Sequence, residues 1–484
     1  MNNSELFELE DRFKRPDTRL TGLFLANFVE SVGRGGVDQF MPIYARAIGG
    51  SISEIGLMTG LFSLASLFQF FWAYLSHRLR RLKIFVVLGW IGNSLLFIPM
   101  MLLKTGQMTV LIIIRAFQAI FHSSAAPTLG SILAEQIPLR ERASRITFFT
   151  RIGLLGVFLG TLAGGTLISF ITDSLEFELE TAFLIAFGWT IFLGFLSSGL
   201  FHLTVYENPS MKRIGPSDII ENSIIYNSTP SRLDFYKIAK IYLTKFSNFW
   251  VFCNFAGIYY FAVYLAGPFF VILSIEIYGF SFFMASILTS VTTAAQFLAS
   301  LYISKAQLLD RYGRRFPLLI GIVLVSFATI SVIIPYYLNV PTFLWCIISW
   351  IILGSGWGIV NGSISVFLLD LIHPQYRLPL IAAYNTITGL TMFIGALVGG
   401  ILTEILQNVV SIFMIRSMLT LFTLALLARV KEPMFPGSIV HIRRNFLFKD
   451  FRSNAGQGPE LVPTPVKSRQ SAIWNRQLFR KTSK

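Results

Sequence analysis

Charged residues are scarce in this 484-residue chain, in which Asp, Glu, Lys and Arg make up only 13%. Soluble domains carry about 25% charged residues, whereas hydrophobic residues alone reach 54% here. The apolar residues occur in blocks of about 20 or more, long enough to cross a bilayer as helices. Barrel strands would instead appear as short alternating segments. The composition therefore predicts an all-α integral membrane protein.

Cysteine is nearly absent, and so are the motifs of enzymes. Cys253 and Cys346 both fall inside apolar runs, which argues against a disulfide framework or a reactive thiol. The sequence contains no phosphate-binding Gly-Lys-Ser/Thr loop, no H-E-x-x-H, no G-x-S-x-G and no metal-ligand cluster. We therefore expect no enzyme, no cofactor, no metal and no direct use of ATP.

The net charge of +15 is distributed in a way that predicts the orientation of the chain. No basic soluble domain of the kind that binds nucleic acid is visible. Instead, the basic residues gather in every second link between the expected spans, and cytoplasmic links carry such an excess. We expect a multi-pass protein of the cell membrane with both termini in the cytoplasm. The twelve expected spans are 20–45, 52–75, 84–103, 108–135, 146–170, 181–204, 246–274, 281–305, 316–337, 342–370, 379–405 and 410–430.

A polar segment, 206–245, divides the spans six and six. The expected organisation is an N-terminal bundle, 20–205, and a C-terminal bundle, 246–430, joined by this central cytoplasmic loop. Residues 1–19 form a polar leader. The tail, 431–484, has eleven Lys or Arg against three acidic residues and is expected to be disordered near anionic lipid.

One loop identifies a family. Residues 306–315 read Ala-Gln-Leu-Leu-Asp-Arg-Tyr-Gly-Arg-Arg, and the Asp-Arg-x-Gly-Arg-Arg core resembles the cytoplasmic loop signature of the major facilitator superfamily. An internal repeat accompanies it, since Glu135 and Asp370 are 235 residues apart, as are Arg142 and Arg377. Two six-helix halves of parallel topology are what that superfamily has. The resemblance implies its fold, twelve transmembrane helices in two pseudo-symmetric bundles.

The resemblance also assigns the loop to a cytoplasmic gate. In similar proteins the Asp of the loop pairs with its Arg residues and with a neighbouring helix end. The weaker upstream copy, 73–81, has His77 where the other copy has Asp310, so we expect a weaker latch in the N-terminal half. The expected gate residues are Asp310, Arg311, Gly313, Arg314, Arg315, His77, Arg78 and Arg81. Intracellular salt bridges that close the outward-facing state are expected from Glu135, Arg142, Arg151, Asp370 and Arg377.

The first span carries three charges, Glu30, Arg34 and Asp38, at four-residue spacing and hence on one stripe. Charges at that depth cost about 2.5–3.5 kcal/mol each on insertion scales, so they must face protein or a water-filled cavity. Two interpretations stay open. The stripe is either a self-neutralising ladder that fixes helix packing, or the wall of a central cavity with a carboxylate that binds protons or substrate.

The fourth span offers a partner for this stripe. Arg115 and Gln118 resemble a second family signature, R-x-x-Q-G, with Ala119 in place of Gly. In similar proteins this arginine faces the cavity and is implicated in proton coupling. Because Arg115 lies at a depth close to that of Asp38, we predict that the two pair. His122 follows on nearly the same face, either as a hydrogen-bonded packing residue or as part of the site.

Fewer polar residues mark the C-terminal half. Trp357 and Asn361, one turn apart, are expected in the opposite wall of the cavity, with simple packing as the alternative. Glu404 and Arg416 lie in adjoining spans near the outer face, where they could pair with each other.

Glycines in the fifth span resemble the G-x-x-x-G-P-x-x-G-G pattern of antiporters, with Thr161 in place of Pro. The eleventh span repeats the small-residue stripe. Close helix packing explains these glycines without reference to substrate, and we favour that interpretation. The residues concerned are Gly156, Gly160, Gly164, Gly165, Gly395, Gly399 and Gly400.

The sequence thus predicts a secondary active transporter of a small molecule that works by alternating access. Proton-coupled export of an amphipathic or drug-like compound, as in the drug/proton antiporters it resembles, is the first hypothesis. One alternative is a uniporter or symporter for a sugar or an organic anion, with the anion held by Arg34 and Arg115. Another is a receptor or scaffold that no longer transports. Expected partners are the substrate, protons and membrane lipids, with no nucleic acid, and the protein is expected to be a monomer.

Overall fold

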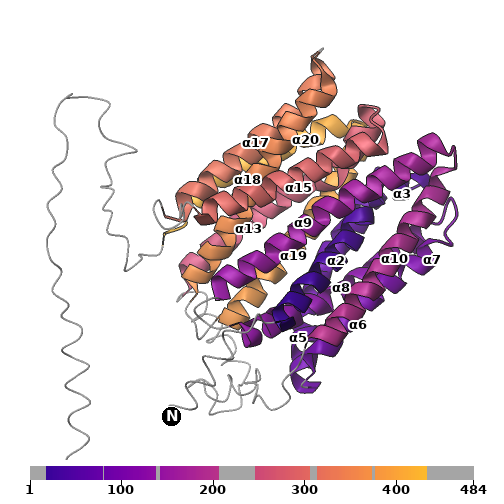
Figure 1. Ribbon diagram of the computed structural model, residues 1–484. Coiled ribbons are helices and arrows are strands. Elements are labelled where there is room, and N and C mark those ends of the chain that lie inside the picture. The colour runs from indigo at the N-terminus through magenta and orange to yellow at the C-terminus, as the bar shows by residue number, and fades with distance from the viewer. Residues whose placement is uncertain are drawn as a thin grey trace, which may run out of the picture. The chain divides into compact units, whose positions relative to one another are not determined.

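Apolar helices dominate the chain because a backbone inside hydrocarbon must satisfy its own hydrogen bonds. The computed structural model describes residues 18–79, 81–137, 142–205, 246–305, 313–338, 340–372 and 377–432. Within these ranges, the chain forms helices and turns and no strands (Figure 1). They all belong to one compact unit, residues 1–435. The leader up to residue 17, the central loop 206–245 and the tail from residue 433 lie outside the described residues.

The helices follow the expected spans closely. In the N-terminal half they are α2 (Thr18–Asp38), α3 (Met41–Ala47), α4 (Ile52–Leu64), α5 (Phe68–Leu79), α6 (Leu82–Leu95), α7 (Phe97–Met100), α8 (Met108–Gln136), α9 (Arg142–Ser169) and α10 (Leu179–Thr204). In the C-terminal half they are α13 (Ser247–Ala266), α14 (Phe270–Ile272), α15 (Phe282–Lys305), α17 (Arg315–Tyr337), α18 (Thr342–Leu371), α19 (Arg377–Leu406) and α20 (Val409–Leu427).

Eleven segments of the described chain are long and apolar enough to cross a membrane. The first expected span, formed by α2 and α3, is not among them, because Glu30, Arg34 and Asp38 lower its hydropathy. The predicted twelve-helix membrane fold is confirmed, and its most polar member is the helix with the charged stripe.

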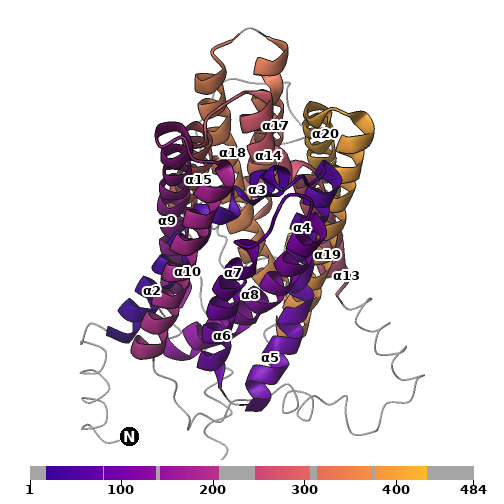
Figure 2. The ribbon, with the colours of Figure 1, turned by 90° about the vertical axis from the view of Figure 1, so that its right-hand side faces the viewer.

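The two halves repeat the same neighbour relations. In the first half α2 packs on α9 and α10, and α8 packs on α6 and α4. In the second, α13 packs on α19 and α20, and α18 packs on α17 and α15, which are the equivalent helices. Across the halves α4 lies along α19 and α9 along α15, so the interface obeys the same symmetry (Figure 2). The repeat in sequence is therefore also a repeat in packing.

Glycines permit these close helix contacts. A Cβ placed at Gly160 would overlap the carbonyl oxygen of Val32, and one at Gly164 would overlap that of Gly36. In the second half, a Cβ at Gly399 would overlap the carbonyl oxygen of Leu265. These positions bring backbone against backbone, which is the packing role of small residues in membrane helices.

The hydrophobic core shows where the halves meet. Toward the predicted outer end, one continuous buried cluster contains side chains of both halves, among them Phe40, Tyr44, Phe183, Phe270 and Trp350. Toward the predicted cytoplasmic end, the described residues form two separate clusters, one within each half. The buried core is thus shared by both halves at the predicted outer end and divided between them at the predicted cytoplasmic end.

An ion pair crosses between the halves at the predicted outer end. Arg46, in α3, donates from Nε to Glu276 Oε1 at 2.9 Å and from Nη2 to Oε2 at 3.3 Å. Both side chains are about one-third exposed, 38% and 32%. Glu276 lies in the π-helical turn Leu273–Ile277 that follows α14.

Replacing Arg46 with alanine is expected to loosen this outer contact and favour opening at that end. Because exposed ion pairs contribute about 0–1 kcal/mol, the population should shift about fivefold at most. The measurement is the labelling rate of Thr59→Cys, on the cavity wall, by an impermeant maleimide added from outside. Arg46→Lys should label like the parent, and an unchanged rate in Arg46→Ala would contradict this role of the pair.

Candidate functional site

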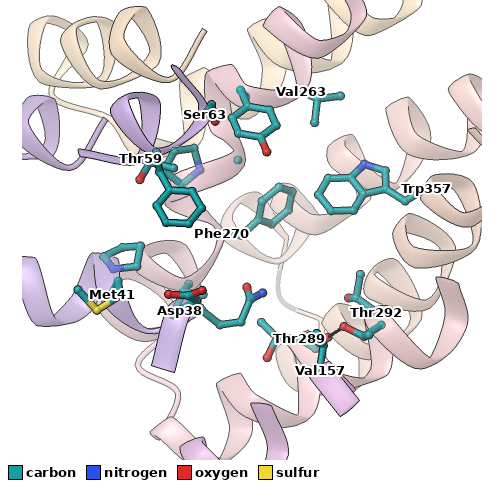
Figure 3. Close-up of a pocket in the computed structure, with 18 of the residues that line it drawn as sticks. Asp38, Met41, Thr59, Ser63, Val157, Val263, Phe270, Thr289, Thr292 and Trp357 are labelled. Atoms are coloured by element: carbon teal, nitrogen blue, oxygen red, sulfur yellow. Dashed lines mark hydrogen bonds between the residues drawn. The ribbon is translucent and has the colours of Figure 1, made fainter. Parts of the chain in front are cut away.

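A cavity of about 410 Å³ lies between the two halves. Helices α2, α4, α8 and α9 supply one wall, and α13, α14, α15 and α18 supply the other. Figure 3 shows Asp38 and Thr59 on one side, with the rings of Phe270 and Trp357 and the hydroxyls of Thr289 and Thr292 opposite. Its size and mainly apolar wall suit a small organic molecule.

Asp38 and Arg115 form an ion pair on the cavity wall. Arg115 Nη1 donates to Asp38 Oδ1 at 3.1 Å, as the depths of the two residues predicted. The arginine side chain is 8% exposed and the aspartate side chain 23% exposed. The carboxylate is therefore the more accessible member of the pair, and it ends the α2 helix beside the cavity.

Other contacts hold Arg115 in place. Its Nη1 also donates to Gln118 Oε1, and Gln118 Nε2 donates to the carbonyl oxygen of Asn93 at 2.9 Å. Its guanidinium carbon lies 4.8 Å from the ring centroid of Phe62, a cation–π contact from α4. Gln118 is fully buried and does not line the cavity. It therefore orients the arginine from behind.

Glu30 and Arg34 form a second ion pair, about one helical turn nearer than Asp38 to the predicted cytoplasmic end of α2. Arg34 Nε lies 3.4 Å from Glu30 Oε1. Arg34 lines the cavity, whereas Glu30 is buried and does not line it. His122 also stays off the cavity wall, and its ring packs 5.8 Å from that of Phe62. The Nδ1 atom of His122 is buried without a hydrogen-bond partner among the described residues.

The opposite wall agrees with the sequence prediction only in part. Trp357 lines the cavity. Asn361 does not; its Oδ1 lies 3.5 Å from the Tyr260 hydroxyl, behind the wall.

Four polar residues of α15 were missed, although the sequence contained their signal. Thr289, Thr292, Thr293 and Gln296 all line the cavity. Their spacing of three, four and seven residues places them on one helical face. Each threonine hydroxyl donates to the carbonyl three or four residues earlier, so its lone pairs remain for a ligand.

The seventh span is broken where it meets the cavity. The α13 helix ends at Ala266, a 3₁₀ turn follows over Gly267–Phe269, and α14 is only three residues long. Gly267, Pro268 and Phe270 all line the cavity. Irregular backbone at membrane depth is tolerated where it lines such a cavity.

Near the predicted cytoplasmic end, Arg314 Nε donates to Asp370 Oδ2 at 2.9 Å, joining the start of α17 to the end of α18. The Glu432 carboxylate accepts from the backbone N–H groups of Arg314 and Arg315, and Gly313 adopts a left-handed φ of 80° beside it. Sequence reasoning missed Glu432, a distant carboxylate that caps a helix start lacking its own cap.

Several other gate residues are not described. Asp310 and Arg311 lie outside the described residues, as do the side chains of His77, Glu135, Arg142 and Arg377. Arg78 and Arg81 are exposed. Arg151 donates from Nη2 to the backbone carbonyl of Ser300 at 3.0 Å, linking α9 to α15.

The predicted pair between Glu404 and Arg416 is wrong. Glu404 is exposed, whereas Arg416 is fully buried and its three nitrogens have no hydrogen-bond partner within the described part of the chain. The face of α20 that carries Arg416 is turned inward to the core, away from the exposed carboxylate of α19. Nor do three His, Cys, Asp or Glu side chains gather to hold a metal ion anywhere in the described ranges.

Two halves with matching helix packing around a central cavity are the architecture of a membrane transporter. A profile of the Major Facilitator Superfamily matches the chain twice, over residues 23–252 and 251–480, and the chain belongs to that superfamily. It is 25% identical over 402 residues to an uncharacterized MFS-type transporter of Methanocaldococcus jannaschii, covering 79% of this chain and 91% of the relative.

Solved structures share the fold at low identity. An autoinhibited peptide transporter of the POT family matches with a TM-score of 0.64 and 15% identity, over 87% of this chain and 98% of its own. A mutant of the nucleoside transporter NupG matches with a TM-score of 0.62 and 14% identity, over 85% of this chain and 100% of its own. The third structure is a bacterial homolog of the human lysosomal transporter Spinster in an inward-facing and unoccupied conformation. It matches with a TM-score of 0.60 and 16% identity, over 86% of this chain and 95% of its own.

Proposed function

We propose that this protein couples the movement of protons to the export of an amphipathic small molecule by alternating access. The observation that carries the proposal is the Asp38–Arg115 ion pair on the wall of a cavity between the halves. An arginine within hydrogen-bond distance favours the ionised carboxylate, and moving the arginine away favours protonation. A shift of α2 against α8 within the N-terminal half during alternating access, one that separates Arg115 from Asp38, would therefore let the carboxylate bind a proton, and the reverse shift would release it.

The arrangement of the core supports loading from the cytoplasm. In the predicted orientation, the buried core is continuous at the outer end and divided at the cytoplasmic end. We infer that a compound enters the cavity from this divided, cytoplasmic side. The aromatic side chains of the wall, Phe62, Phe270, Trp350 and Trp357, suit an amphipathic body. The charged side chains that line the cavity, Arg34, Asp38 and Arg115, all come from α2 and α8.

The alternative in which Arg34 and Arg115 bind a sugar or an organic anion is less well supported. Each of these arginines already has a carboxylate partner, Glu30 and Asp38 respectively. An anion at this wall would have to displace one of those partners. A scaffold role through the basic tail receives no support from the described residues, because the tail lies outside them.

Proteoliposomes that contain the full-length protein and an internal pH-sensitive dye test the proposal. Amphipathic test compounds of different charge are added one at a time, with and without an imposed pH gradient. We expect at least one compound to move protons in the direction opposite to its own flux, and the gradient to accelerate that flux. Compound flux that is unaffected by the gradient would overturn proton coupling, and liposomes without protein serve as the control.

A further inference from the structure

A buried arginine, Arg416, lies behind the cavity wall and has no role in the proton coupling proposed for Asp38 and Arg115. Arg416, in α20, is 0% exposed, and its Nε, Nη1 and Nη2 atoms make no hydrogen bond to any part of the chain that the structure describes. The guanidinium carbon lies 4.7 Å from the ring centroid of Phe270. Arg416 is thus held by an aromatic face instead of by an anion.

This is a costly arrangement for a resting protein. A guanidinium is charged at every accessible pH and offers five N–H donors, and an unpaired charge in a dry interior is strongly unfavourable. The contact with Phe270 offsets a part of that cost, yet it satisfies none of the donors. A ligand that supplies hydrogen-bond acceptors would therefore satisfy the unpaired N–H groups of Arg416.

Phe270 is the partition between Arg416 and the cavity. Its ring lines the cavity and also packs against Trp350, at a centroid distance of 4.6 Å, and Phe413, at 4.8 Å. It follows the break in the seventh span, where a Cβ added at Gly267 would meet no atom within 4 Å. Figure 3 shows the Phe270 ring in the middle of the view, among the labelled cavity residues. A shift of this short segment would open a path from the cavity to the guanidinium.

The balance of charge around the cavity points to the sign of the ligand. Arg34 and Arg115 are balanced by Glu30 and Asp38. Of the described arginines beside the cavity, Arg416 alone lacks a carboxylate within salt-bridge distance. The site therefore carries one uncompensated positive charge, which an anionic ligand would neutralise.

We propose that Arg416 binds the anionic group of the transported compound when Phe270 moves aside, so that the substrate is an amphipathic organic anion. A carboxylate or a phosphate accepts two parallel N–H bonds from one guanidinium. The apolar body of the compound then lies against Phe62, Trp350 and Trp357. This assignment of substrate class rests on the proposed transport function.

Binding to the purified full-length protein, measured by calorimetry in lipid nanodiscs, tests the assignment without requiring transport. The ligands share one apolar body and differ in charge: 4-phenylbutyrate, 4-phenylbutanol and 4-phenylbutylamine. We expect the carboxylate to bind at least about tenfold more tightly than the alcohol, because hydrogen bonds between two charged groups are stronger than those to a neutral hydroxyl. Arg416→Gln should remove this preference by weakening the binding of the carboxylate more than that of the alcohol.

Two further variants keep the test decisive if Arg416→Gln does not fold. Arg416→Lys should retain a reduced preference for the carboxylate, and Phe270→Ala should increase it because the covering ring is gone. Arg429→Gln, at an exposed arginine just after α20, is the matched control and should bind like the wild type. Equal binding of the carboxylate and the alcohol to the wild type, or a preference that survives in Arg416→Gln, would overturn the proposal.

The same ligands separate this proposal from the proposed function. Selective binding of the carboxylate without any protein-dependent flux would support the Arg416 site and count against transport of that class. Proton-coupled flux of the alcohol with no preference for the anion would support transport and overturn the Arg416 site.

Discussion

Replacing Asp38 with asparagine is expected to abolish proton-driven flux while leaving exchange of the substrate across the membrane intact. Asparagine has nearly the same size and still accepts a hydrogen bond from Arg115, but it cannot take up a proton. Because the carboxylate lines the cavity and is the more exposed member of its ion pair, its loss should remove the coupling ion without closing the substrate path. The measurement compares gradient-driven uptake with counterflow in the same proteoliposomes.

Glu30→Gln provides the comparison that identifies the coupling carboxylate. The sequence alone left Glu30 and Asp38 as equal candidates, but Glu30 is buried, paired with Arg34 and absent from the cavity wall. We therefore expect Glu30→Gln to retain gradient-driven flux, at a reduced rate. Glu404→Gln, at an exposed carboxylate of α19, controls for the loss of a negative charge. Full coupling in Asp38→Asn would contradict the proposed role of that residue.

The second large effect is expected at Gly164, where α9 meets α2. Substitution by alanine would place a methyl group on the backbone of Gly36, which cannot rotate away as a side chain can. The two helices would have to separate, and overpacking of this kind costs about 1–3 kcal/mol. We expect a clearly lower midpoint of thermal unfolding for the purified protein in detergent.

Gly199→Ala is the matched control for Gly164→Ala. Gly199 lies within α10 and is exposed, and a methyl group added there would meet no atom within 4 Å. Its substitution should leave the unfolding midpoint nearly unchanged. Similar midpoints for the two variants would show that the α2–α9 contact is not as close as described.

Much of the architecture followed from periodicity and charge. Runs of apolar residues set the number and bounds of the spans, because a helix must be long enough to cross the hydrocarbon. The four-residue spacing of Glu30, Arg34 and Asp38 fixed their common stripe, and depth in the membrane predicted the Asp38–Arg115 pair, which the structure contains. Each of these inferences uses only position along a helix.

The sequence did not predict how each helix is rotated about its own axis, and this rotation decides which side chains face the cavity, the core or the surface. Glu404 and Arg416 were matched by depth, yet Arg416 faces the core beside Phe270 while Glu404 is exposed. The threonine stripe of α15 had a readable spacing, but only packing against α9 and α18 decided that it faces the cavity.

By itself, then, the sequence determined the membrane class, the superfamily resemblance, the repeat and the charged stripe of α2. Only the tertiary structure decided which charges are neutralised by a partner and which are not. The physical reason is that depth along a helix is encoded locally by residue spacing. The partner of a buried charge depends on which face each helix turns toward its neighbours, and that is settled by packing between segments far apart in the chain.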